Sequence, residues 1–172
     1  MEETYEPITD EVSEMIKGYT PLLQKDYGEA NDCTLTCITA MLSTGNPEVV
    51  YKKVESIAKK YFYNGEKFGT IPFFIKSILD ESAAADSESR YGKGVGFNWS
   101  DIKKLIKQNK PIILSLVNDG RGYYMNHSIT IAGYKEFNKG KIRILAVYDN
   151  WRKTIAYLDF NKLPTVCSIN YL

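Results

Sequence analysis

The side chain best placed to do chemistry in this sequence is the thiol of Cys33. A cysteine is a strong nucleophile only as its thiolate, and a helix N-terminus or a nearby imidazolium can lower its pKa from about 8.5 by several units. Asn31 or Asp32 can cap a helix that continues through Leu42, so Cys33 falls in the first turn, where the helix dipole acts most strongly. Cys37 lies one turn deeper, and we therefore expect Cys33 to be the reactive residue. This segment alone leaves open that both are small buried apolar residues.

His127 is the only histidine in the chain and supplies its one imidazole. It follows a predicted loop at residues 118–126 and begins a predicted strand, so its ring can project into a cleft instead of the core. A single histidine can also be a satisfied structural residue. However, a cysteine followed far downstream by a histidine, and then by an aspartate or asparagine, is the order that a papain-type thiol enzyme needs.

Two further residues could support this pair. Asp149 ends the next predicted strand and could accept a hydrogen bond from the imidazole, which would fix the tautomer and stabilise the cation. Gln24, upstream of the cysteine, could donate a side-chain N–H and join the main-chain N–H of Cys33 in holding an oxyanion. The alternatives are an ordinary turn at residues 149–151 and a solvent-exposed glutamine at position 24.

The elements that must position these residues change in type along the chain. Apolar periodicity and capping residues predict helices at residues 7–17, 33–42, 48–60, 71–79 and 100–106. Short β-branched runs bounded by turn residues predict strands at residues 112–117, 128–134, 142–148, 153–158 and 166–171. The small, polar segment 82–96 is predicted to be a loop.

This order indicates an α+β fold in which an N-terminal helical half packs on a C-terminal, mostly antiparallel sheet, with the site in the cleft between them. The 172 residues suit one domain, residues 1–172, that needs neither metal nor disulfide to fold. We expect residues 1–20 to form an N-terminal helical extension of that domain.

Composition narrows the possible partners. The 22 basic residues balance 21 acidic ones, so the basic surface of a nucleic-acid-binding protein is not expected. No apolar run approaches the roughly 20 residues needed to span a bilayer, so we expect no membrane insertion. No secretory signal is visible, which favours a cytoplasmic protein, although a secreted or cell-surface chain whose signal had been removed would look the same.

Three cysteines and one histidine are too few to indicate a disulfide framework or an ordinary zinc site. Cys33 and Cys37 lack the C-x-x-C spacing of common zinc sites, and a zinc ion would require both of them together with His127 and an acid. We therefore expect no metal and no cofactor.

Five stretches of the sequence, taken in order, resemble the papain-like cysteine peptidases, and most closely the branch of the bacteriocin leader-processing peptidases and their stand-alone relatives. The stretches are residues 22–28, 31–42, 99–114, 126–134 and 146–151. The resemblance extends over most of the chain from about residue 22 to residue 158. It implies a papain-like fold, a peptide or protein substrate, and four roles: Cys33 as nucleophile, His127 as general base, Asp149 as orienting acid and Gln24 as oxyanion donor.

Two positions differ from the family pattern. The family usually has glycine, and then often proline, after its cysteine, where this chain has Thr34 and Leu35; a glycine common before the Lys-Pro pair is Asn109 here. The predicted activity is hydrolysis of peptide bonds through a thioester acyl-enzyme. One alternative is an acyltransferase or peptide ligase that uses the same triad. Another is a catalytically inactive module that binds a peptide in the same cleft, and Thr34 is the feature that favours it.

Overall fold

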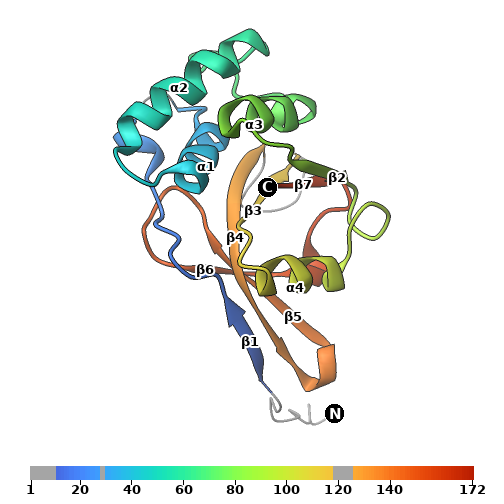
Figure 1. The fold of residues 1–172 in the computed structure, drawn as a ribbon. Helices are drawn as coiled ribbons and strands as arrows, with labels where there is room; N and C mark the ends of the chain where they lie inside the picture. The colour runs from blue at the N-terminus through green and yellow to red at the C-terminus, as the bar shows by residue number, and fades with distance from the viewer. Residues whose placement is uncertain (1–10, 28–29, 118–125) are drawn as a thin grey trace.

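The fold is a seven-stranded sheet with helices on both faces (Figure 1), as shown by a computed structural model that describes residues 11–27, 30–117 and 126–172. The helices are α1 (Cys33–Leu42), α2 (Pro47–Lys60), α3 (Ile75–Ala83) and α4 (Trp99–Lys107). The strands are β1 (Val12–Met15), β2 (Glu88–Tyr91), β3 (Ile112–Leu116), β4 (His127–Phe137), β5 (Ile142–Tyr148), β6 (Ala156–Asp159) and β7 (Cys167–Tyr171). None of the helices in these ranges has the length and apolar character needed to cross a bilayer.

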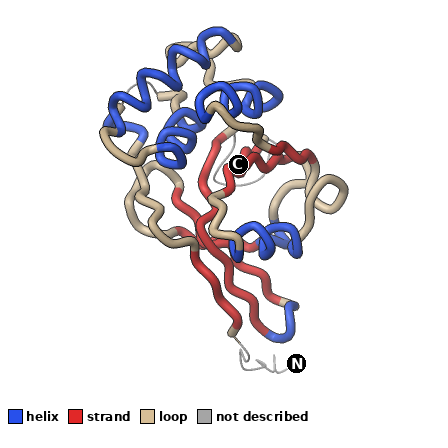
Figure 2. The backbone as a smooth tube through the Cα atoms, in the orientation of Figure 1, coloured by secondary structure: helices blue, strands red, loops and turns tan. Residues whose placement is uncertain are grey.

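Every strand pairing in the described sheet is antiparallel, and the strand order is β2-β7-β3-β4-β5-β6. Helices α1, α2 and α3 gather at one end of the molecule, and α4 lies apart from them beside the strands (Figure 2). The predicted α+β arrangement of a helical N-terminal half on an antiparallel sheet is therefore confirmed.

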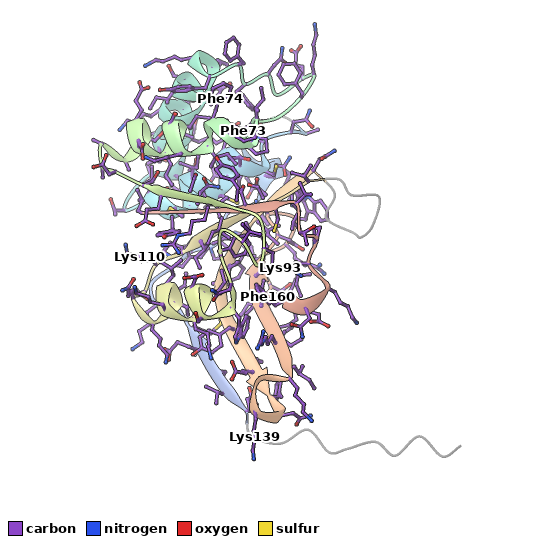
Figure 3. All side chains as sticks on the ribbon, turned by 90° about the vertical axis from the view of Figure 1, so that its right-hand side faces the viewer. Phe73, Phe74, Lys93, Lys110, Lys139 and Phe160 are labelled. Carbon is purple, nitrogen blue, oxygen red and sulfur yellow. The ribbon has the colours of Figure 1, made fainter. Side chains whose placement is uncertain are left out.

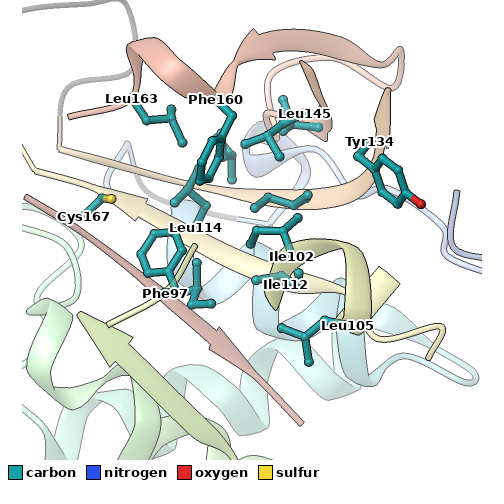
Figure 4. Close-up of a cluster of buried hydrophobic side chains, with 14 of the residues drawn as sticks. Phe97, Ile102, Leu105, Ile112, Leu114, Tyr134, Leu145, Phe160, Leu163 and Cys167 are labelled. Atoms are coloured by element: carbon teal, nitrogen blue, oxygen red, sulfur yellow. The ribbon is translucent and has the colours of Figure 1, made fainter. Parts of the chain in front are cut away.

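Alternating residues of β3 divide the hydrophobic core between the two faces of the sheet. Ile113 packs with side chains of α1, α2 and α3, whereas Ile112 and Leu114 face α4 on the opposite side (Figure 4). All three are fully buried. Burial of each such side chain is worth roughly 1.5–3 kcal/mol, so the short strand β3 anchors both layers.

The N-terminal helix predicted at residues 7–17 is wrong for the residues that the structure describes, because Val12–Met15 form β1 instead. Strand β3 pairs with only the first part of β4, up to Ile131, which leaves the main-chain groups of Gly133–Glu136 without a β3 neighbour. Strand β1 pairs with those residues and satisfies their hydrogen bonds. The expected helical extension at residues 1–20 is corrected accordingly; residues 1–10 lie outside the described ranges.

Other predictions differ in detail; for example, the strand predicted at residues 153–158 is Ala156–Asp159, and the one predicted at residues 128–134 extends to Phe137. The segment 82–96 is not entirely a loop, because Glu88–Tyr91 pair with β7 and form the last strand of the sheet. The third helix begins at Ile75 instead of Ile71, after a 3-10 turn at Pro72–Phe74. The predicted loop at residues 118–125 lies outside the described ranges. The bounds of β5 agree with the prediction.

The connection after β2 is fixed to the turn that follows β6 by one ammonium group. Nζ of Lys93 donates hydrogen bonds to the carbonyl oxygens of Phe160, Asn161 and Leu163, at 3.2, 3.0 and 2.5 Å. The same ammonium lies 5.6 Å from the centre of the Phe160 ring, and Figure 3 shows the two side chains close together. These contacts therefore attach the segment that follows β2 to the 3-10 turn that follows β6.

The close pairing of β1 with β4, in which Met15 lies opposite Gly133, gives a stability prediction. A Cβ atom added at Gly133 would lie 2.1 Å from Sδ of Met15 and 2.5 Å from the main-chain oxygen of Glu14. We expect Gly133→Ala to lower the free energy of unfolding by about 1–3 kcal/mol, measured by urea denaturation. Gly45→Ala is the matched control, because nothing lies within 4 Å of its added Cβ. Equal stability of the two variants would contradict this account of β1.

Candidate active site

A cleft of about 470 Å³ opens beside the start of α1, and the predicted nucleophile and base both line it. Its wall also includes the following residues: Ala30, Asn31, Thr34, Lys67, Phe68, Gly69, Thr70, Ile71, Pro72, Ile75, Ser115, Leu116, Val117, Asn126 and Ser128. The structure thus places Cys33, from the helical half, and His127, from the sheet, on the surface of one cavity. Asp149 and Gln24 are described residues that do not line the cleft.

Cys33 is the first residue of α1, and Asp32 occupies the N-cap position that the sequence predicted. The main-chain oxygen of Asp32 accepts the first helical hydrogen bond, from N of Thr36 at 2.8 Å, so the N–H groups of the first turn have no intrahelical partner. Burial raises the pKa of the Cys33 thiol above its usual 9.0, and the neighbouring polar groups of Ser128 and Thr34 oppose that effect only in part. The free thiol is therefore the form that burial favours.

The His127 ring is held on two sides. Its Nε2 donates to the main-chain oxygen of Asp149 at 2.8 Å, and the ring stacks on Trp151 with 4.4 Å between centroids and 26° between planes. Because a carbonyl can only accept, Nε2 carries the proton in the neutral ring, and Nδ1 carries the lone pair. Burial lowers the pKa of His127, and the hydrogen bond and negative charge of Asp149 oppose that effect.

The hydrogen bond between Asp149 and the imidazole differs from the predicted one, because the acceptor is the main-chain oxygen of Asp149 instead of its carboxylate. Its carboxylate accepts from the N–H groups of Trp151 and Arg152, at 3.1 and 3.2 Å, and from Nε of Arg152 at 2.8 Å. Asn150, with φ of 64°, turns the chain so that the carboxylate caps the turn that follows. The acid therefore fixes the turn that presents its own carbonyl to the ring.

Gln24 is buried behind the cleft, next to the segment that precedes the cysteine. Its Nε2 donates to the main-chain oxygen of Ala30 at 2.5 Å, and its main-chain N–H donates to the oxygen of Asn150 at 2.9 Å. A carboxamide has two N–H groups, and the bond to Ala30 engages one of them. The structure thus brings Gln24 close to the turn that holds His127.

Asn150 joins the helical half to the sheet, a role that sequence reasoning missed. Its Nδ2 lies 3.1 Å from the oxygen of Cys33, 3.0 Å from the oxygen of Ser128 and 3.2 Å from Sγ of Cys37. The residue is 2 % exposed. The available signal was its position after a strand, where an asparagine tolerates positive φ more readily than other residues.

Asp32 supplies a buried carboxylate directly before Cys33. The hydroxyl groups of Tyr51 and Tyr63 donate to its two oxygens. The side chain makes no capping bond to α1, so its partners come from α2 and from the chain that follows α2. The tyrosines lie 19 and 31 residues away in sequence, and no local pattern indicated the contact.

Thr34 lies beside Cys33 with its hydroxyl group turned to the sheet. Its Oγ1 is 2.8 Å from Oγ of Ser128, which is 2.9 Å from Oγ of Ser115. All three residues are buried at the base of the cleft. Within the described ranges, no group of three or more His, Cys, Asp or Glu side chains is arranged to hold a metal ion.

Comparison with known proteins identifies a family for this sequence. Residues 16–163 match the family described as Peptidase_C39 like family. The fold is similar to the crystal structure of UfSP from C. elegans, with a TM-score of 0.58 and 10 % sequence identity over 99 % of this chain. This chain covers 35 % of that protein, and at this identity the likeness concerns the fold alone. A search of curated protein sequences finds no match.

Proposed function

This chain belongs to the Peptidase_C39 like family, a family of papain-like cysteine peptidases. From that premise, we propose that Cys33 and His127 cleave peptide bonds through a thioester intermediate. The observation that carries this proposal is the shared cleft. The thiol and the imidazole line the same cavity, and the bond from Nε2 to the Asp149 carbonyl selects the neutral tautomer whose basic nitrogen is Nδ1.

The proposed reaction has two halves. Nδ1 of His127 takes the proton of the Cys33 thiol, and the sulfur attacks the carbonyl carbon of the scissile bond. The C–N bond then breaks, and the imidazolium gives its proton to the leaving amine. Water, deprotonated by Nδ1, attacks the thioester; the carboxylic acid leaves, and the sulfur recovers its proton as a thiol. The net result is hydrolysis of one amide bond.

Two donors are proposed for the oxyanion. The main-chain N–H of Cys33 is at the N-terminus of α1, where the helix dipole favours negative charge. The second proposed donor is the side-chain amide of Gln24, because the bonds of this residue to Ala30 and Asn150 connect it to the segment before Cys33 and to the turn that binds His127. Asp149 is proposed to orient the ring through its carbonyl oxygen, and its charge favours the imidazolium.

The lining of the cleft supports a peptide substrate with apolar side chains near the scissile bond. One wall is formed by Phe68, Ile71, Pro72 and Ile75, and Lys67 is the one charged residue among the described lining. Phe68 is 49 % exposed and Ile71 is 37 % exposed, so part of this apolar wall is open to a bound peptide. Extended peptides with neutral residues are therefore the substrate class that we propose.

Replacement of the thiol tests the proposal. We expect Cys33→Ala to lower hydrolysis of a quenched fluorescent peptide library by roughly 10³-fold or more while the chain stays folded, because the nucleophile is lost. Cys37→Ser is the matched control on the same helix. A serine hydroxyl can still accept the hydrogen bond from Asn150, so activity should stay near that of the unchanged protein. Full activity of Cys33→Ala would end the proposal.

The pH dependence of kcat/KM follows from the two burial effects. The active pair carries one proton, shared between thiol and imidazole. Because burial lowers the pKa of His127, the acid limb should lie below its ordinary value of 6.5. Because burial raises the pKa of Cys33, the alkaline limb should lie above 9.0. If kcat/KM already decreases as the pH is lowered through 7, measured on protein shown to be folded at each pH, this expectation is wrong.

A further inference from the structure

We propose that Arg152 is a positioning residue for His127 that acts through Asp149: its guanidinium holds the Asp149 carboxylate in the turn after β5 and balances the negative charge beside the ring. The inference rests on the proposed function, because it assigns a further residue to the base of the same Cys–His pair. None of the four site residues expected from the sequence supplies a positive charge to this carboxylate.

Arg152 contacts both oxygens of the Asp149 carboxylate. Its Nε donates to Oδ2 at 2.8 Å, and its main-chain N–H donates to Oδ1 at 3.2 Å. The main-chain N–H of Trp151 also donates to Oδ1, at 3.1 Å. These bonds close residues 149–152 into one compact turn and fix the direction of the carboxylate within it.

The same turn supplies the two contacts that hold the imidazole. The main-chain oxygen of Asp149 accepts from Nε2 of His127 at 2.8 Å, and the Trp151 ring stacks on the imidazole with 4.4 Å between centroids. Both groups belong to the turn that the carboxylate closes, so the ion pair with Arg152 stabilises the position of each. A change at Arg152 therefore reaches the ring through Asp149.

The charge of Asp149 acts on the ring from a place that solvent does not reach. The Asp149 side chain is fully buried, whereas that of Arg152 is 52 % exposed. A buried charge is screened little by water and salt, so an opposite charge at hydrogen-bond distance offsets most of its field. Burial lowers the pKa of His127, and the negative charge of Asp149 opposes that effect. Loss of the guanidinium therefore leaves more negative charge to favour the imidazolium.

The elements that build the site carry other ionisable groups as well. Cys33, at the start of α1, and Lys67 line the same cavity as the ring. Cys37 lies one turn further along α1, and the carboxylate of Asp32 is bound by two tyrosine hydroxyl groups. Tyr148 ends β5, directly before the turn. All of these groups stay unchanged in the variants below, so a shift between variants reports on the pair of residues 149 and 152.

The test is a pH titration of the His127 ring by nitrogen NMR in the full chain, which contains no other histidine. Arg152→Gln removes the positive charge. Because two main-chain N–H groups still bind the Asp149 carboxylate, it should stay ionised. We expect the midpoint of ring protonation to rise by roughly 0.5–1 pH unit, the effect of losing a half-exposed ion pair. Arg152→Lys keeps the charge and should return the midpoint to that of the unchanged protein.

Arg143→Gln is the matched control, because Arg143 lies near the other end of β5 and its Nε donates to the main-chain oxygen of Gly140. It should leave the midpoint unchanged. Asp149→Asn tests the route: it should lower the midpoint, and Arg152→Gln added to it should cause a much smaller rise than in the unchanged protein. If Arg152→Gln fails to raise the midpoint, or raises it equally with and without Asp149→Asn, the inference is wrong.

The ring titration does not depend on turnover, so it is separable from the test of hydrolysis. A chain that cleaves no peptide yet shows the expected shifts contradicts the proposed function and supports the role of Arg152. A chain that cleaves peptides but shows no shift in Arg152→Gln overturns the inference alone.

Discussion

One carboxamide, that of Asn150, joins the two halves of this protein where the proposed chemistry takes place. Its nitrogen lies within hydrogen-bond distance of the main-chain oxygen of Cys33 on α1 and of Ser128 on β4. Each half carries one member of the reacting pair, so the relative position of thiol and imidazole depends on this contact. An asparagine satisfies both needs of the position, because it accepts positive φ and supplies two N–H donors. An aspartate would place two acceptors against carbonyl oxygens.

Burial sets the electrostatic character of the site. It raises the pKa of Cys33 and lowers the pKa of His127, and both effects favour the neutral thiol beside the neutral imidazole. Transfer of the proton from sulfur to Nδ1 keeps the net charge of the pair unchanged, which is the kind of step that a buried site tolerates. The stacked Trp151 covers the ring on one side, so the bond from Nε2 to Asp149 persists through the transfer. In the proposed mechanism, the N-terminus of α1 then stabilises the negative charge on the sulfur.

The sequence predicted those features that depend on local pattern. A capping residue, Asn31 or Asp32, before an apolar run indicated that a helix begins near Cys33, and a β-branched run between turns indicated β5 with its observed bounds. The resemblance to papain-like cysteine peptidases is confirmed by the family match. Strand β1 was predicted as a helix because its apolar spacing fits one, and only the long edge of β4 explains why it is a strand.

Contacts between residues far apart in sequence could not be predicted in the same way. The direction of the Asp149 carboxylate depends on the φ of Asn150, and the tyrosines on Asp32 come from other elements. Thr34 was interpreted as the feature that favours an inactive binding module, and its contact with Ser128, 94 residues away, was not predicted. Side-chain hydrogen bonds between separate elements follow from the packed fold and leave no periodic signal in the sequence.

The central claim, that Cys33 and His127 share a proton, is tested most directly by nitrogen NMR of the imidazole. His127 is the only histidine, so its ring nitrogens are identified without further assignment. The account predicts that the ring of the unchanged protein is neutral at pH 7, with the proton on Nε2 and the lone pair on Nδ1, because burial disfavours charge on both groups and the Asp149 carbonyl can only accept. A ring that carries two protons at pH 7, or a neutral ring with its proton on Nδ1, would contradict it.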